Sequence, residues 1–200
     1  MSSNKLNIKV EDCRQKLLEG PSWHLDSYGH WQLLDDLSDA LYDRFQQLGG
    51  IEYLEESITY YRQGFHLCPI GDNNRSTSLN NLASAVYTRF RQLGKMEDLE
   101  EAITCHRQAI ANRPHGDPNR SLSLNNFACA LYSRFEQSGG MEDLEEAITC
   151  HRRALALRPH GHPDRSYSLD NLANAMSTRF KQMGDLKSPS STCSPTSWPS

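Results

Sequence analysis

Residues 81–125 read NLASAVYTRFRQLGKMEDLEEAITCHRQAIANRPHGDPNRSLSLN, and residues 126–170 read NFACALYSRFEQSGGMEDLEEAITCHRRALALRPHGHPDRSYSLD. The two stretches are identical at 31 of 45 aligned positions. A more diverged copy begins at Asp36, and a partial copy begins at Asn171. A fixed period of this size indicates stacked supersecondary units, because one small unit cannot bury its apolar face alone.

Each 45-residue unit has the pattern of two α-helices. The first helix carries an apolar stripe at positions i, i+3, i+4, i+7 and i+11, which in the second copy is Leu79, Leu82, Ala83, Val86 and Phe90. We predict that Asp117 caps such a helix with Pro118 as its first residue. Glycine is the usual residue just past a helix end, so we expect first helices to end near Gly94, Gly139 and Gly184.

The second helix opens with acidic residues such as Glu97 and ends in an arginine followed by a proline, as at Arg113 and Pro114. No stretch alternates apolar and polar residues as a strand would. The sequence therefore predicts an all-α fold with three complete helix pairs and a flanking helix at each end. The predicted core consists of large apolar residues of the first helices: Leu37, Leu41, Phe45, Leu82, Val86, Phe90, Phe127, Leu131, Phe135, Leu172, Met176 and Phe180.

A family resemblance follows from the small residues of the second helix. Ala102, Ala109 and Pro114 have the spacing A-x6-A-x4-P, which recurs 45 residues later and is similar to the tetratricopeptide repeat. The long repeat also resembles kinesin light chains and, more closely, fungal tetratricopeptide arrays joined to a caspase-like CHAT domain. The resemblance covers roughly Leu34 to Leu186. It implies an α-solenoid of stacked antiparallel helix pairs, coiled into a right-handed superhelix.

The repeat register divides the chain into three parts. Residues 1–30 form an N-terminal segment with a degenerate capping helix, residues 31–186 form the array, and residues 187–200 form a Ser/Pro/Thr-rich tail that we expect to be disordered. The register vanishes after Leu186. We therefore expect the final helix to leave part of its apolar side uncovered, which favours either self-association or a missing partner helix: Leu172, Met176, Phe180 and Met183.

Composition excludes several classes of partner. The formal net charge is -4, so no basic field attracts nucleic acid, and the mean hydropathy is -0.69, with no apolar run long enough to span a membrane. The start of the chain shows no secretory signal, so we expect a cytoplasmic protein. Its six cysteines are expected to be free thiols, since Cys105 and Cys150 align with Tyr60.

Candidate chemical sites have simpler explanations. The Cys105-His106 pair invites a dyad or zinc interpretation, but adjacent helical residues point about 100° apart and the first repeat has tyrosines there. Helix packing explains His106 better. No phosphate-binding loop, nucleophile elbow or zinc spacing is present. We predict a protein that is not an enzyme and that uses no metal or cofactor.

The first helices carry a second, polar stripe that core packing does not explain. In tetratricopeptide arrays the first helix lines a concave groove, so the resemblance implies that this stripe binds an extended peptide, with acidic residues favouring a Lys or Arg end. The predicted peptide-binding residues are Asp35, Asp36, Asp39, Asp43, Asn80, Asn81, Ser84, Thr88, Asn125, Asn126, Asn171 and Asn174. We expect the side chains of Asn81 and Asn126 to point to solvent.

The leading functional hypothesis is a scaffold that binds peptide segments of other proteins. The alternative is the regulatory arm of a larger CHAT/caspase-like or signalling protein whose effector domain is absent from this chain. A helical-repeat protein that reads RNA bases is the weakest hypothesis, because the stripe has no aromatic or basic ladder.

Overall fold

The computed structural model describes residues 3–19, 27–68 and 73–185. These ranges hold eight α-helices, and the predicted all-α fold is confirmed. The helices are α1 (Ser3–Leu18), α2 (Ser27–Leu48), α3 (Ile51–Leu67), α4 (Asn73–Leu93), α5 (Met96–Asn112), α6 (Arg120–Ser138), α7 (Met141–Ala156) and α8 (Arg165–Asp185). The predicted tail, residues 187–200, lies outside the described residues.

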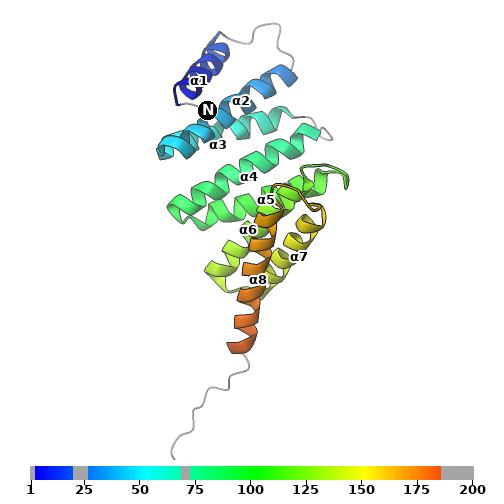
Figure 1. Ribbon diagram of the computed structural model, residues 1–200. Helices are drawn as coiled ribbons and strands as arrows, with labels where there is room; N and C mark the ends of the chain where they lie inside the picture. Colours follow the sequence, from blue (N-terminus) through cyan, green and yellow to red (C-terminus); the bar gives the residue numbers. More distant parts are fainter. Residues whose placement is uncertain (1–2, 20–26, 69–72, 186–200) are drawn as a thin grey trace, which may run out of the picture.

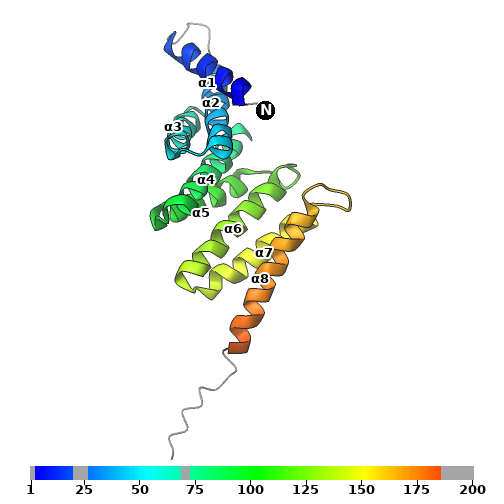
Figure 2. The ribbon, with the colours of Figure 1, turned by 60° about the vertical axis from the view of Figure 1, so that its left-hand side comes forward.

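The helices stack in chain order, each packed against the next (Figure 1). The closest packing joins the partners of three pairs, α2 with α3, α4 with α5, and α6 with α7. First helices also contact one another along the stack, as α4 does with α6 and α6 with α8. The view turned by 60° keeps α1 at one end and α8 at the other (Figure 2). This is the predicted solenoid of three helix pairs with one flanking helix at each end.

The core runs between the helices along the stack. Buried residues of α4, α5, α6 and α7 meet in one cluster that contains Phe90, Leu99, Ile103, Leu131 and Ala154. Ten of the predicted core residues are buried or packed against such clusters: Leu37, Leu41, Phe45, Leu82, Val86, Phe90, Phe127, Leu131, Phe135 and Leu172. Met176 and Phe180 are exposed, because none of the described residues packs over that side of α8. This corrects the core prediction for these two residues and confirms the expectation that the final helix leaves part of its apolar side uncovered.

The helix ends predicted at Gly94 and Gly139 are confirmed, and the predicted start of α6 at Pro118 is wrong. Gly94 and Gly139 have φ of 69° and 73° and follow the last residues of α4 and α6, while α8 continues through Gly184. Asp117 does not cap α6. Its carboxylate instead accepts a hydrogen bond of 2.7 Å from the backbone N–H of Asn119, which keeps Pro118 in the loop and starts the helix at Arg120.

One arginine at the start of a first helix binds the end of the helix before it. Arg120 donates to the carbonyl oxygens of Ile110 and Arg113, at the end of α5. The same two bonds recur in the neighbouring repeats, where Arg75 binds Phe65 and Cys68, and Arg165 binds Leu155 and Arg158. The carbonyls of Phe65, Ile110 and Leu155 also accept a backbone N–H at the helix end. Each guanidinium group therefore adds a second bond there and ties the end of one helix to the start of the next.

No disulfide joins the five cysteines within the described ranges, at positions 13, 68, 105, 129 and 150, and Cys193 lies outside them. Across residues 3–19, 27–68 and 73–185, every helix lacks the length or the apolar character needed to cross a bilayer.

Candidate functional site

The predicted site residues lie on the first helices α2, α4, α6 and α8, and we call the surface that they share the first-helix face. The acidic end of this face is on α2. Asp36 receives a salt bridge of 3.0 Å from Lys9 of α1, and Asp39 accepts a hydrogen bond from the hydroxyl of Tyr61 on α3. Asp43 is exposed. Asp35 accepts a hydrogen bond from Asn81 of α4, so three of the four acidic side chains have partners on neighbouring helices.

Asp35 has the most perturbed carboxyl group of this cluster. Burial, followed by the negative charges of Asp39 and Asp36, raises the pKa of Asp35 to about 7. A hydrogen bond from Asn81 on α4 and the charge of Lys9 act in the opposite direction. Removal from water also raises the pKa of Asp39, although part of that residue remains exposed. The cluster therefore holds less negative charge near neutral pH than four free carboxylates would.

The two asparagines at the start of each stripe have different roles. Asn80 and Asn125 are buried, with 5% and 0% of their surface exposed. The side-chain oxygen of Asn80 accepts a bond of 3.0 Å from Ser123, and that of Asn125 accepts one of 3.2 Å from Asn171. Both amides join one repeat to the next, so neither side chain is available to a ligand, contrary to the prediction.

The next asparagine of each stripe reaches back toward the preceding first helix. Asn126 donates a bond of 3.3 Å to the hydroxyl of Ser84, and Asn171 approaches the sulfur of Cys129 at 3.7 Å. Asn81 and Asn126 are half-buried, which corrects the expectation that both point freely to solvent. Asn174, by contrast, is exposed.

A ladder of tyrosine hydroxyls crosses the same face, and sequence reasoning missed it. Tyr42 bonds to Thr88 at 2.8 Å, and the same contact joins Tyr87 to Ser133 at 2.8 Å. A third rung joins Tyr132 to Thr178 at 2.9 Å. Each rung links one first helix to the next. The signal was present in the sequence, because a tyrosine recurs every 45 residues with a Ser or Thr 46 residues after it.

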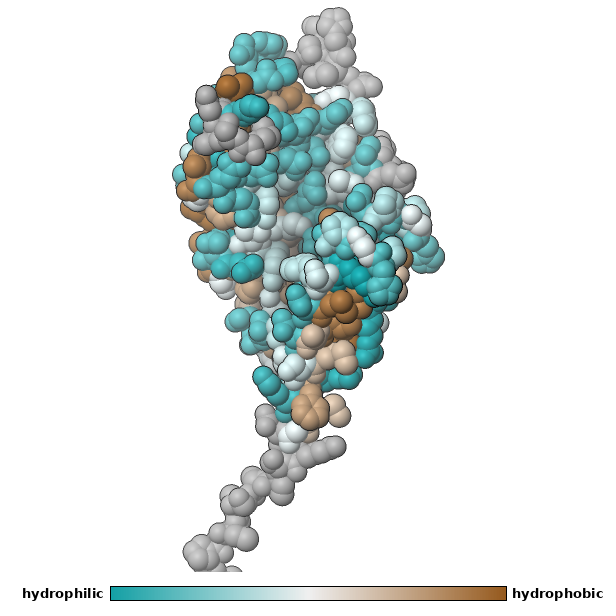
Figure 3. Space-filling model, viewed as in Figure 1, coloured by the Kyte–Doolittle hydropathy of each residue, from teal (hydrophilic) through white to brown (hydrophobic). Residues whose placement is uncertain are grey.

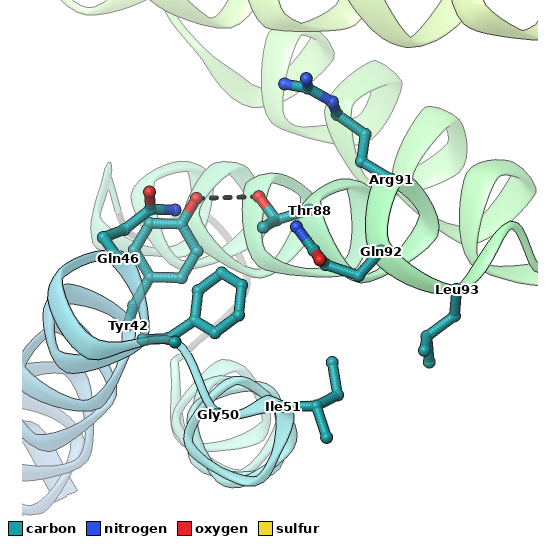
Figure 4. Close-up of a pocket in the computed structure, with 10 residues that line it drawn as sticks. Tyr42, Gln46, Gly50, Ile51, Thr88, Arg91, Gln92 and Leu93 are labelled. Atoms are coloured by element: carbon teal, nitrogen blue, oxygen red, sulfur yellow. Dashed lines mark hydrogen bonds between the residues drawn. The ribbon is translucent and has the colours of Figure 1, made fainter.

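Two hollows open beside this ladder. The larger, of about 560 Å³, lies between α2, α3 and α4. Figure 4 shows the Tyr42–Thr88 rung at its wall, and Phe45, Ile51 and Leu93 add apolar surface. The smaller, of about 250 Å³, is lined by residues of α4, α6, α7 and α8, including Cys129, Tyr132, His151, Asn171 and Asn174. The first-helix face thus combines hydrogen-bonding groups with concave apolar surface.

The cysteine and histidine side chains have the properties of packing residues. Burial lowers the pKa of His106 to about 3 and that of His151 to about 4, so both rings are neutral near pH 7. Burial raises the pKa of the Cys105 and Cys150 thiols to about 11, which leaves little reactive thiolate. Within the described ranges, no three His, Cys, Asp or Glu side chains are placed to hold a metal ion.

Comparisons with known proteins agree with this geometry. A sequence model of the family described as tetratricopeptide repeat matches residues 75–115 and 121–164. Among solved structures, BtubC (BKLC) from P. vanneervenii is similar with a TM-score of 0.65 and 18% identity, over 98% of this chain and 81% of that one. A comparison with curated proteins finds no match.

A second similar structure is a putative kinesin light chain from Podosopora anserina with nearly identical TPR-like repeats. Its TM-score is 0.63 at 18% identity, over 90% of this chain and 82% of that one. At such identities the likeness shows the fold, a solenoid of stacked helix pairs.

Proposed function

We propose that this chain is a tetratricopeptide-type repeat protein, which the family match and the fold support. From that premise, it is a cytoplasmic, non-catalytic scaffold whose first-helix face binds an extended peptide segment of another protein. The observation that carries this proposal is the coincidence of three features on one face. These are the acidic cluster of α2, the hydroxyl ladder and the two hollows beside it. The ladder and the buried amides hold neighbouring repeats together, which keeps the face in one shape before a ligand arrives.

The chemistry of the face favours a peptide with a Lys or Arg near one end. Asp35, Asp39 and Asp43 lie at i, i+4 and i+8 on α2, so they form one acidic row. Lys9 already pairs with Asp36, which leaves Asp35 and Asp43 without a cation opposite them in the described residues. A ligand ammonium or guanidinium group would occupy that position, and the exposed amide of Asn174 would bond to peptide backbone farther along.

The raised pKa of Asp35 makes this proposal testable by pH. A cationic ligand stabilises the carboxylate form, and the carboxyl group of Asp35 titrates near pH 7 in the free protein. Binding should therefore strengthen as the pH rises from 6 to 8, because the ligand no longer has to displace a proton. Ionisation increases from about a tenth to about nine tenths over this range, so we expect a severalfold gain in affinity.

The probe is a fluorescein-labelled octapeptide with two lysines at one end and alternating Ser and Ala after them. Its binding to the protein is measured by fluorescence anisotropy. We expect a dissociation constant near ~10 µM that rises with added salt. Asp35→Asn combined with Asp39→Asn should weaken binding about tenfold and remove its pH dependence. The matched control changes the same number of charges on exposed second-helix positions, Glu97→Gln and Glu142→Gln, and should bind as the wild type does.

Equal binding by wild type and the Asp35/Asp39 variant would refute the proposed site. A peptide with two glutamates in place of the lysines provides the charge control. If it binds as tightly as the lysine peptide, the acidic row does not select the ligand.

A further inference from the structure

One side of α8 exposes a row of large apolar residues. Leu169, Met176, Phe180 and Met183 expose 45%, 38%, 79% and 48% of their surface, and we call these four residues the apolar strip. They lie at i, i+7, i+11 and i+14, which places them on one side of the helix. Brown and tan atoms run down the part of the surface where Figure 1 places α8 (Figure 3). The partly buried Leu172 lies beside the strip and packs toward Phe135 and Leu144.

The same positions are buried in the preceding repeat. Leu124, Leu131 and Phe135 of α6 expose 1%, 0% and 7%, and they stand 45 residues before Leu169, Met176 and Phe180. In α6 the neighbouring α7 covers this side. The apolar strip therefore has the composition of a helix-packing surface. No described residue covers it.

We propose that a second copy of this chain covers the strip, with the two α8 helices packed antiparallel about a twofold axis at Met176. In this arrangement Leu169 of one copy faces Met183 of the other, Leu172 faces Phe180, and Met176 faces its own counterpart. The strip is thus self-complementary in the antiparallel direction, since every large apolar residue lies opposite another one.

Charge supports the same direction. Asp170 and Lys181 lie on one flank of the strip, near its two ends. Antiparallel packing brings Asp170 of each copy beside Lys181 of the other. In a parallel twofold pair this flank of one copy would lie on the opposite side of the interface from the same flank of the other, so Asp170 would have no Lys181 beside it. Opposite charges in register favour a pair, so the flank favours the antiparallel direction.

The other end of the array is a poorer match for the strip. The buried side of α1, with Leu6, Val10 and Cys13, packs on α2. Its exposed side is mainly charged or polar, and includes Lys5, Glu11, Asp12, Gln15, Lys16 and Glu19. The large apolar residues exposed there are Ile8 and Leu18. A head-to-tail contact of α8 with α1 would bury these charges against the strip. Polar outer faces are typical of solenoid ends that stay in water.

The size of the strip sets the strength of the contact. Residues 169 to 183 span roughly 21 Å of helix, which is short for a standard interface of about 800 Å² per partner. We therefore expect a reversible dimer with a dissociation constant of about 10–100 µM. The two-fold contact closes on itself, so assembly should stop at two copies.

The first test is sedimentation equilibrium of the full 200-residue chain between about 5 and 300 µM. Wild type should pass from monomer to dimer across this range. Met176→Glu places two carboxylates at the axis, and Phe180→Glu removes the most exposed apolar residue. Each should raise the dissociation constant at least tenfold, with an unchanged circular dichroism spectrum. Ile8→Glu is the matched control, because it also replaces an exposed apolar residue by glutamate but on α1, and it should leave the dimer intact.

The second test fixes the direction. On a Cys193→Ser background, Met176→Cys should form a disulfide between copies on mild oxidation. Leu169→Cys alone should not, because antiparallel packing holds the two sites about 21 Å apart. A mixture of Leu169→Cys and Met183→Cys chains should give the mixed dimer. Asp170→Lys should weaken dimerisation and Asp170→Lys with Lys181→Asp should restore it.

Three results would overturn the proposal. One is a wild-type chain that remains monomeric at 300 µM. If Met176→Cys is then also protected from a thiol reagent, residues 186–200 of the same chain cover the strip instead of a second copy. Another is a dimer that Met176→Glu leaves unchanged but Ile8→Glu disrupts. The third is efficient self-crosslinking of Leu169→Cys, which would show a parallel pair.

Discussion

The helices α6 and α8 occupy the same position in successive repeats, and they differ most in how much of their apolar side is covered. Phe135 of α6 exposes 7% and the corresponding Phe180 of α8 exposes 79%. The pair at Leu131 and Met176 exposes 0% and 38%. The two helices have nearly the same pattern of residue types, so the sequence of the helix does not decide which residues are buried. Cover by the second helix that follows in the chain decides it: α7 covers this side of α6, and no described residue covers it on α8.

The polar contacts of these two helices show the same dependence on neighbours. Arg134 of α6 binds Asp143 of its own repeat through two nitrogens, at 2.6 and 2.8 Å, and binds Glu100 of the preceding repeat at 2.8 Å. Arg179 of α8 makes only the backward contact among the described residues, with Glu145 at 3.2 Å. The arginine of the inner helix α6 thus binds both its own repeat and the preceding one, whereas that of α8 binds the preceding repeat.

The largest expected difference is between two phenylalanines. Phe135→Ala should lower the free energy of unfolding by about 3–5 kcal/mol, because it leaves a cavity between α6 and α7. Phe180→Ala should change it by no more than about 0.5 kcal/mol in the monomer. Urea denaturation at low protein concentration measures both. A loss below about 1 kcal/mol for Phe135→Ala would mean that Phe135 does not pack as described.

A second, intermediate effect is the pH dependence of the free energy of unfolding that the two buried histidines cause. The folded-state pKa of His106 is about 3 against 6.5 for the free side chain. The stabilising contribution of the neutral ring is therefore complete above about pH 6.5 and is lost as the pH falls toward the folded-state value. At pH 5 the loss amounts to about 2 kcal/mol.

His106→Phe removes that titration and two ring nitrogens that have no hydrogen-bond partner in the protein. Relative to wild type it should gain up to about 2 kcal/mol between pH 7 and pH 5. His151→Phe should gain nearly as much at pH 5, because that pH lies above both folded-state pKa values, and the two variants should differ only below about pH 4, the value to which burial lowers the pKa of His151. Denaturation at the two pH values measures each gain. Equal pH dependence in wild type and His106→Phe would show that the ring is not buried in the neutral form.

The smallest effect compares the two arginines. Arg134→Ala removes three charged hydrogen bonds to two partners and should cost about 1–2 kcal/mol. Arg179→Ala removes one contact to a half-exposed carboxylate and should cost about 0.5 kcal/mol or less. Melting curves at low and high salt test this order. The reverse order would indicate that α8 is held by a neighbour other than α7.

The fold followed from the sequence because the repeat period and the apolar stripe are local patterns. Leu131 and Phe135 repeat the positions of Val86 and Phe90, so one helix predicted the next. Periodicity alone placed Phe180 in the core, and only the loss of register after Leu186 indicated that it would be exposed. A periodic pattern states which side of a helix is apolar, but it does not state whether another helix covers that side.

The candidate site was harder to predict, because it depends on how neighbouring first helices cross. Asn80 and Asn81 are adjacent and chemically identical, yet Asn80 is buried against Ser123 and Asn81 lies half-buried at the surface. Adjacent helical residues point about 100° apart, so only the position of α6 decides which of the two it covers. The tyrosine ladder depends on the same spacing, with Tyr87 reaching Ser133 on the next first helix.

The arginine that binds the end of the preceding helix has a consequence for how such a protein can lengthen. Arg120 and its two carbonyl acceptors lie within one 45-residue stretch, and Arg165 with its own acceptors lies in the next. A tandem duplication of this stretch therefore copies donor and acceptors together, and every new junction forms the bonds that the old ones had. Growth by whole units needs no compensating substitution at this junction, whereas an insertion between Arg113 and Arg120 would separate the guanidinium group from its carbonyls. A gene that encodes such a junction can gain or lose repeats in single steps and still produce a folded array.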